Sequence, residues 1–292
     1  ILPPLTDTSW QFYFDQYKKI PQYQLLNNDM ELNQFKVIFY WEYFHRVLGR
    51  IIGLFFLIPL IFFYFSKKIN KDYMKICFII LVLIILQGII GWYMVLSGLT
   101  NDVTVSHYRL SIHLINAIII ISMLFWLIKG VISNKIKLFF NFSKNNLPFL
   151  ILFLLILLQI IVGAFVSGLD AGKIYQTWPL MNNYFFPDDL SFRNIVFPEI
   201  FNEPSFVQFI HRKLAYIILL FVLVISFLTF YKKNKDMYNS VYFLLAMIFI
   251  QIILGIFTLL SGAYILIASL HQISTILLLI SSIYFYYKSL KV

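Results

Sequence analysis

The sequence predicts an all-α protein that crosses a membrane several times. Hydrophobic residues make up 61% of the 292 residues, whereas charged residues make up only 12%. Apolar runs long enough to cross about 30 Å of hydrocarbon recur along the chain. Because backbone groups in lipid have no water to bond to, these runs should be helices. The formal net charge of +10 lies largely in lysines of the short loops between the runs, which favours a membrane anchor and argues against nucleic acid as a partner.

Seven apolar runs are each long enough for one transmembrane helix. They are residues 37–65, 74–97, 107–130, 147–168, 206–231, 238–260 and 263–287. Residues 1–36, before the first run, are predicted to hold short amphipathic helices.

Charge in the connecting loops predicts the orientation of these helices. The loops after the first, third and fifth runs are rich in lysine, whereas the long loop 169–205 is mainly acidic. Because cytoplasmic loops carry an excess of Lys and Arg, the lysine loops and the C-terminus should be cytoplasmic. Residues 1–36 and 169–205 should then face outward.

An internal repeat organises the chain. The matching features are His45-Arg46 with His211-Arg212, His113 with His271, and a Q-x-x-x-G motif at Gln87–Gly91, Gln159–Gly163 and Gln251–Gly255. The repeat predicts two tandem four-helix bundles, at 37–130 and 147–292, joined by a cytoplasmic linker at 131–146. The first bundle lacks a counterpart of run 147–168. We therefore expect eight helices in the native protein, with about one helix and part of a loop preceding Ile1.

Four histidines of the repeat are predicted to lie in one layer near the outer face, paired within each bundle. They are His45, His113, His211 and His271. A single histidine of this kind would be as readily a polar residue packed in a helix contact as a ligand. Four at matched depth are harder to dismiss, because ionisable residues inside a membrane are costly and usually functional. Neutral imidazoles from two helices of a bundle can take both axial positions of a haem iron. His107, which has no partner in the repeat, is predicted to be a solvated loop residue.

Other residues near this layer allow two interpretations each. Arg46, Arg50 and Arg212 would either reach lipid phosphates or pair with haem propionates. The motif glycines would leave room for a macrocycle or for a neighbouring helix. Glu42 would either handle protons beside His45, with which it shares a helix face, or form an ion pair with Arg46. Its counterpart in the second bundle is Gln208, which has no titratable proton.

Several stretches resemble the haem A synthases of the alphaproteobacterial and mitochondrial branch. They are "FYWEYFHRVLGRIIGL" (Phe39–Leu54), "VSHYRLSIHL" (Val105–Leu114), "GAFVSGLDAGKIYQTWPLM" (Gly163–Met181) and "FVQFIHRKLAY" (Phe206–Tyr216). The likeness runs from residue 1 to about residue 280. This branch lacks an outward cysteine pair, and the only cysteine here is Cys77.

The resemblance implies a specific oxidation reaction and a division of labour between the bundles. Members oxidise the C8 methyl group of haem O to the formyl group of haem A, the prosthetic group of terminal cytochrome oxidases. Carried onto this chain, His211 and His271 would bind haem b. His45 and His113 would face the substrate haem O, with Glu42 beside them.

The resemblance also implies a cellular setting. Haem O synthase would act upstream, cytochrome oxidase assembly factors would be further partners, and an electron acceptor or donor stays unidentified. The bacterial inner membrane is favoured over the mitochondrial one.

Two other classes of protein remain open from the residues alone. A di-haem b electron carrier of the quinone-linked type would explain four histidines but makes no use of the difference between Glu42 and Gln208. A transporter would explain the repeat, although transporter sites more often lie at the midplane between broken helices.

Overall fold

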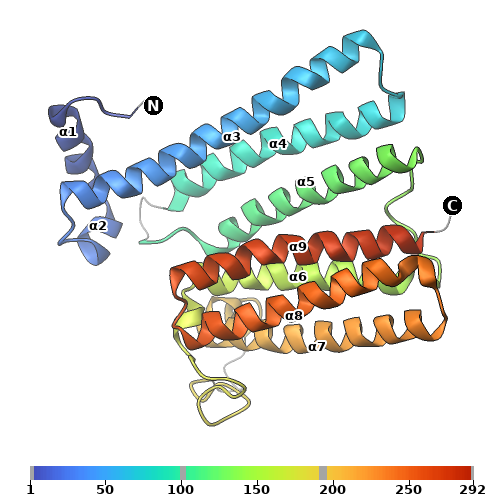
Figure 1. The fold of residues 1–292 in the computed structure, drawn as a ribbon. Helices are drawn as coiled ribbons and strands as arrows, with labels where there is room; N and C mark the ends of the chain where they lie inside the picture. Colours follow the sequence, from blue (N-terminus) through green and yellow to red (C-terminus); the bar gives the residue numbers. More distant parts are fainter. Residues whose placement is uncertain (1–2, 99–102, 191–195, 291–292) are drawn as a thin grey trace. The chain divides into compact units, whose positions relative to one another are not determined.

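The computed structural model describes residues 3–98, 103–190 and 196–290, and these residues are mainly helical. In this part of the chain, seven helices are long and apolar enough to cross a membrane. They are α3 (Leu32–Ser66), α4 (Lys71–Gly98), α5 (His107–Ser133), α6 (Leu147–Gly168), α7 (Pro204–Tyr231), α8 (Tyr238–Leu260) and α9 (Ile265–Ser289) (Figure 1). They confirm the predicted all-α integral membrane protein, and the seven predicted runs match them to within a few residues.

The chain divides into two compact units, Ile1–Ile120 and Ile121–Val292, and the division falls inside α5. In the first unit, α3 and α4 lie side by side as an antiparallel pair (Figure 1). Two short helices, α1 (Asp7–Tyr17) and α2 (Pro21–Leu26), precede α3.

Aromatic packing fixes α1 against the first turns of α3. Trp10 and Phe14 of α1 and Phe35 of α3 are buried together. The ring of Phe14 lies 5.3 Å from that of Phe35, and the ring of Trp10 lies 6.4 Å from it. Burial of such large side chains removes much apolar area from water, so this cluster stabilises the region that leads into Glu42 and His45.

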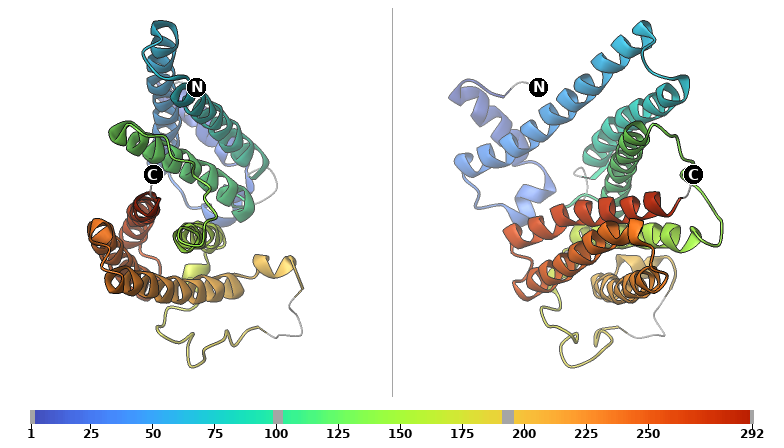
Figure 2. Two further views of the ribbon diagram at one scale, coloured as in Figure 1. Left: turned by 90° about the vertical axis from the view of Figure 1, so that its right-hand side faces the viewer. Right: turned by 45° about the vertical axis from the view of Figure 1, so that its right-hand side comes forward.

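The second unit is a four-helix bundle. Each of α6, α7 and α8 packs against the next helix, and α6 also packs against α9, which closes the ring (Figures 1 and 2). Short connections from α7 to α8 and from α8 to α9 favour this up-and-down arrangement, and a long connection joins α6 to α7. The interior holds aliphatic and aromatic side chains, with Leu152, Val222, Leu279, Phe285 and Tyr286 fully buried.

The connection from α5 to α6 holds the C-terminal end of α9. Lys137 donates from Nζ to the carbonyl oxygens of Tyr287, at 3.2 Å, and of Leu290, at 2.5 Å. Trp126 donates from Nε1 to the carbonyl oxygen of Lys137, at 3.0 Å. The last carbonyls of a helix lack intrahelical partners, and a lysine satisfies them favourably. This end of the bundle is therefore fixed by the predicted linker.

Candidate haem-binding sites

Three histidines inside the long helices lie against a glutamine of a neighbouring helix. Gln87 of α4 donates from Nε2 to the carbonyl oxygen of His113 of α5, at 3.0 Å. Gln159 of α6 makes the same bond to His211 of α7 at 3.0 Å. Gln251 of α8 makes it to His271 of α9 at 3.1 Å. A hydrogen bond from a side chain of one helix to a carbonyl oxygen of its neighbour fixes how far the two helices are shifted along their axes. Each of these bonds therefore sets the depth of one histidine.

The glycine of each motif makes room for the same histidine's ring. A Cβ atom added at Gly91 would lie 2.9 Å from Cε1 of His113. The corresponding distances are 3.1 Å from Gly163 to His211 and 3.0 Å from Gly255 to His271. The motif glycines therefore accommodate the imidazole of a neighbouring helix. Of the two interpretations open from the sequence, the described contacts are those of helix against helix.

His45 and His113 face each other in the first unit. Their ring centroids are 6.5 Å apart and the ring planes are inclined at 66°. Metal–imidazole bonds are about 2.0–2.1 Å long, so two imidazoles that share one metal ion place their ring centres roughly 6 Å apart. The pair therefore fits the two axial ligands of a single iron.

An apolar hollow of about 410 Å³ adjoins His45. It is lined by Trp41, Phe44, His45, Val47, Leu48 and Ile51 of α3. Ligand sites are typically hollows of this size with apolar walls and few polar groups, so this lining suits a flat apolar ring system.

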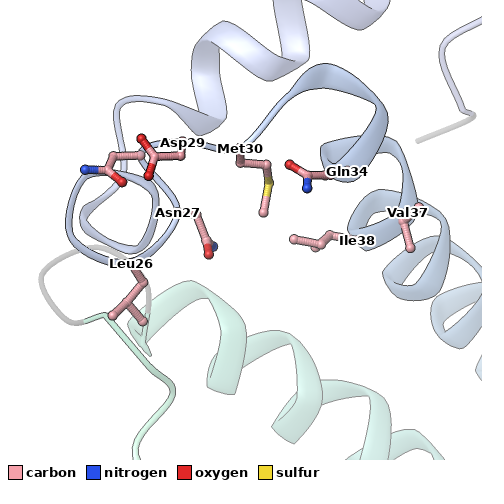
Figure 3. A pocket seen from close by; sticks show the side chains of 8 residues that line it. Leu26, Asn27, Asp29, Met30, Gln34, Val37 and Ile38 are labelled. Carbon is pink, nitrogen blue, oxygen red and sulfur yellow. The ribbon is translucent and has the colours of Figure 1, made fainter.

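A second hollow, of about 460 Å³, has a different character. It lies where α2 leads into α3, and its lining includes the polar side chains of Asn27, Asp29 and Gln34 together with Met30 (Figure 3). It contains no histidine, so it is not a candidate for axial ligation.

His211 and His271 are the corresponding pair in the second unit. Nδ1 of His271 is buried without a hydrogen-bond partner. A buried polar atom normally has a partner, and an imidazole nitrogen is a good ligand for iron, so His271 suits a haem ligand. In the described ranges, no group of three or more His, Cys, Asp or Glu side chains gathers, so paired histidines are the candidate metal ligands there.

Glu42 and Arg46 form an ion pair on α3. Nη2 of Arg46 lies 3.4 Å from Oε2 of Glu42, and each side chain is about half exposed, at 49% and 54%. Exposed pairs one turn apart contribute only about 0–1 kcal/mol. The pair predicted as an alternative for Glu42 is thus present, and it leaves the carboxylate accessible. Arg50 lies one turn further along α3 and is exposed.

Arg212 and Gln208 hold the connection between α6 and α7, which the sequence did not predict. Arg212 donates to the carbonyl oxygens of Tyr175, at 2.8 Å, of Thr177, at 2.9 Å, and of Leu180, at 3.2 Å. Gln208 donates to the carbonyl oxygen of Tyr175 at 3.1 Å. The propionate role of Arg212 stays a prediction, and Nε of its guanidinium is buried without a hydrogen-bond partner.

The same connection carries a hydrogen-bonded acidic network. The hydroxyl of Tyr175 lies 2.5 Å from Oδ1 of Asp188 and 2.7 Å from Oδ1 of Asp189. Burial raises the pKa of Tyr175, so its hydroxyl stays protonated and remains a donor. The hydrogen bond from Tyr175 lowers the pKa of Asp188 from its usual range. Ser205, in the first turn of α7, donates to Asp189. This network ties the connection to the helix that carries His211.

His107 is buried rather than solvated, so that prediction was wrong. It is the first residue of α5, and only 7% of its surface is exposed. Sequence position at a helix end does not reveal which side the first turn packs against.

Comparison with known proteins gives one consistent result. The family model for cytochrome oxidase assembly proteins (COX15-CtaA) matches residues 1–283. A haem A synthase of Pelagibacter ubique (strain HTCC1062) is 49% identical over 291 residues, which are 99% of this chain and 84% of that protein. One of Bartonella quintana (strain Toulouse) is 42% identical over 278 residues, 93% of this chain and 76% of that protein. One of Rickettsia africae (strain ESF-5) is 40% identical over 292 residues, 98% of this chain and 86% of that protein.

A family model that matches residues 1–283 and relatives 40–49% identical over nearly the whole chain show the family. The chain belongs to the COX15-CtaA family of cytochrome oxidase assembly proteins.

Proposed function

We propose that this protein is a haem A synthase, an oxidoreductase that converts the C8 methyl group of haem O to the formyl group of haem A. The observation that carries the proposal is the facing pair His45 and His113, 6.5 Å apart in a unit that also presents Glu42. The family and the similarity to curated haem A synthases support the same reaction.

The two units have different tasks in this proposal. His45 and His113 hold the substrate haem, and apolar side chains of α3 from Trp41 to Ile51 lie beside it. His211 and His271 hold a resident haem b. A haem iron supplies one-electron and oxygen chemistry when it is bound.

Glu42 serves the chemistry in the first unit. Oxidation of a methyl to a formyl group releases protons as well as electrons, and an accessible carboxylate can accept or relay protons. Its counterpart Gln208 has no titratable proton and is bonded to the carbonyl oxygen of Tyr175. Arg46 and Arg50 provide charge for propionates at the substrate site, and Arg212 does so for haem b.

The charge of the loops and the proposed reaction also indicate the orientation of the protein and its partners. The lysine-rich loops and the C-terminus lie in the cytoplasm of a bacterium, and the histidine layer lies near the outer face of its inner membrane. Haem O synthase delivers the substrate, an electron acceptor or donor completes the oxidation, and assembly factors of cytochrome oxidase receive the product.

A di-haem b electron carrier is the second candidate, because two pairs of histidines can hold two resident haems. The difference between Glu42 and Gln208 favours the synthase, because a carrier leaves both of its haems chemically unchanged and needs no proton acceptor at one of them.

Haem extraction tests the proposal. The protein is expressed from its whole gene in a bacterial host that makes haem O and lacks a haem A synthase of its own. Chromatography of extracted haems should show haem A with the gene and only haem O and haem b with the empty vector. Two bound haem b per protein without any haem A would contradict the proposal and establish the carrier.

A further inference from the structure

The three motif glutamines differ in how their amide groups are held. In the first unit, Oε1 of Gln87 accepts a hydrogen bond of 2.7 Å from Nδ2 of Asn116. Asn116 also donates to the carbonyl oxygen of Leu83, at 3.0 Å. The oxygen is therefore fixed, and the amide nitrogen must face His113.

Gln251 is held in the same way on the second unit's last helix pair. Its Oε1 accepts a hydrogen bond of 2.5 Å from Oγ of Ser274. Asn116 and Ser274 each lie three residues after a histidine, a spacing that places them on the histidine's face of the helix. With the oxygen held, Nε2 of Gln251 faces the carbonyl oxygen of His271 and the hydroxyl of Thr275, at 2.6 Å.

The third glutamine lacks this fixation. The residue three positions after His211 is Leu214, which is buried and cannot donate a hydrogen bond. Oε1 of Gln159 is buried and has no hydrogen-bond partner. Its amide nitrogen still lies 3.0 Å from the carbonyl oxygen of His211. A buried acceptor without a partner is costly, so the Gln159 amide is held by fewer bonds than the other two.

We propose that Gln87, Gln159 and Gln251 are positioning residues for the axial histidines. Each amide N–H bonds the histidine's own carbonyl and lies against its ring, which sets the depth and rotation of the imidazole. The residue three positions after the histidine determines how rigidly the glutamine amide holds the imidazole. The orientation is fixed for His113 and His271 and is adjustable for His211.

The physical reason is that partners behind a metal-binding histidine set the orientation of its ring and its strength as a ligand. The distances from Nε2 to the ring nitrogens are 3.2 and 3.3 Å for Gln87 and 3.2 and 3.3 Å for Gln159, and Nε2 of Gln251 lies 3.4 Å from Nε2 of His271. Each glutamine therefore contacts the ring as well as the backbone. The inference deepens the proposed function and depends on it, because it assumes that these imidazoles bind haem iron.

The test uses the resident haem of the second unit in the purified, haem-loaded protein. Gln251→Glu keeps the acceptor for Ser274 but removes the N–H donor, and Gln251→Leu removes both. Each should retain haem b while shifting the g-values of its low-spin electron paramagnetic resonance signal and its reduction potential. Ser274→Ala should shift both readouts in the same direction by less, since it releases the amide without removing it.

Leu214→Asn provides the reciprocal variant. Asparagine at this position copies Asn116 and should fix the Gln159 amide, which should narrow the low-spin signal. Gln159→Leu should shift the signal and abolish the effect of Leu214→Asn when the two are combined.

Unchanged g-values and potential in Gln251→Glu and Ser274→Ala, at normal haem content, would overturn the inference. If Gln251→Leu does not accumulate, Gln251→Glu still decides, because it keeps the acceptor for Ser274 and removes only the N–H donor. Failure of the proposed function looks different: the wild-type protein would then form no haem A from haem O, whatever the g-values and potential of its haem b.

Discussion

His271 is part-buried in an apolar helix, and its Nδ1 atom is buried without a hydrogen-bond partner. Polar atoms rarely remain so in a folded protein, and those that do commonly serve a ligand or a reaction. Its ring edge is also fixed against Gly255, which lets the backbone of α8 approach. Packing alone does not explain why His271 has a buried ring nitrogen without a partner.

Replacement of either histidine in the second unit should therefore remove haem b from its six-coordinate state. In His211→Ala or His271→Ala, one axial position loses its ligand, and the low-spin bis-histidine spectrum should disappear. Optical and paramagnetic resonance spectra of the purified variants measure this. An unchanged low-spin spectrum in both variants would refute the assignment of these two residues.

At the residue scale, the sequence is most informative where a residue type is rare in its surroundings. Histidines inside apolar runs stand out, and their repeat predicts two pairs, of which His45 and His113 face each other. Arg212 shows where this reasoning fails. Its three described partners are the backbone carbonyl oxygens of Tyr175, Thr177 and Leu180. Because every residue type carries a carbonyl, no pattern of side chains in the sequence predicts this contact.

In the helix pair α4 and α5, one glycine of α4 makes room for a histidine ring of α5. Gly91 faces His113 at a distance that leaves no room for a methyl group, whereas Gly88, one turn earlier, has nothing within 4 Å. The two positions lie on the same helix and differ only in what they face. They form a matched pair for substitution.

Gly91→Ala should destabilise the protein, and Gly88→Ala should not. The added methyl at position 91 must displace His113, and overpacking of this kind costs about 1–3 kcal/mol. At position 88 alanine removes only glycine's unfavourable entropy in a helix, worth roughly 0.5–1 kcal/mol. Thermal unfolding in detergent should show a lower Tm for the first and an equal or higher Tm for the second. Equal behaviour of the two variants would show that the contact with His113 does not matter.

The connection between α6 and α7 should loosen in acid. The hydrogen bond from Tyr175 lowers the pKa of Asp188, so the folded connection favours the charged carboxylate. The resulting stability is present above the usual Asp pKa of about 3.9 and is lost as the pH falls through the lowered value. The protection of residues 175–190 against amide hydrogen exchange, relative to the intrinsic rate at each pH, should fall over that range. Tyr175→Phe should exchange faster already at neutral pH and lose most of the pH dependence, and an unchanged pH profile would contradict the role of this bond.

The helices themselves were the easiest elements to predict. A run of about 20 apolar residues has one stable conformation in lipid, so composition alone determines it. The local packing of polar residues was harder. His107 was expected in solvent, and the amide contacts of the three glutamines were not predicted, because both depend on which helix faces which.

At the scale of the whole molecule, lysine distribution is the only guide to which side of the membrane each end occupies. The linker 131–146 contains Lys135, Lys137 and Lys144 and no acidic residue. A reporter fused after Lys144 should therefore be cytoplasmic, and one placed near Asp188 should be external. Paired alkaline phosphatase and green fluorescent protein fusions measure this, and the opposite labelling would overturn the orientation.

In the proposed function, the first unit performs the oxidation while the second unit holds a resident haem. Glu42 distinguishes the two units, because Gln208 occupies the corresponding position in the second. Glu42→Gln removes a titratable group and nearly preserves volume. Since the Glu42–Arg46 pair is half exposed and such pairs contribute about 0–1 kcal/mol, its loss should leave the protein folded.

The most direct measurement is the haem composition of cells that express Glu42→Gln, together with the haem b spectrum of the purified variant. Loss of a proton-handling group costs on the order of 10²- to 10⁴-fold in rate. Haem O or a partly oxidised intermediate should therefore accumulate with little haem A, while the low-spin haem b spectrum matches the wild type. Near-normal haem A at normal protein levels would contradict the account and leave the oxidation to the histidines and the haem iron alone.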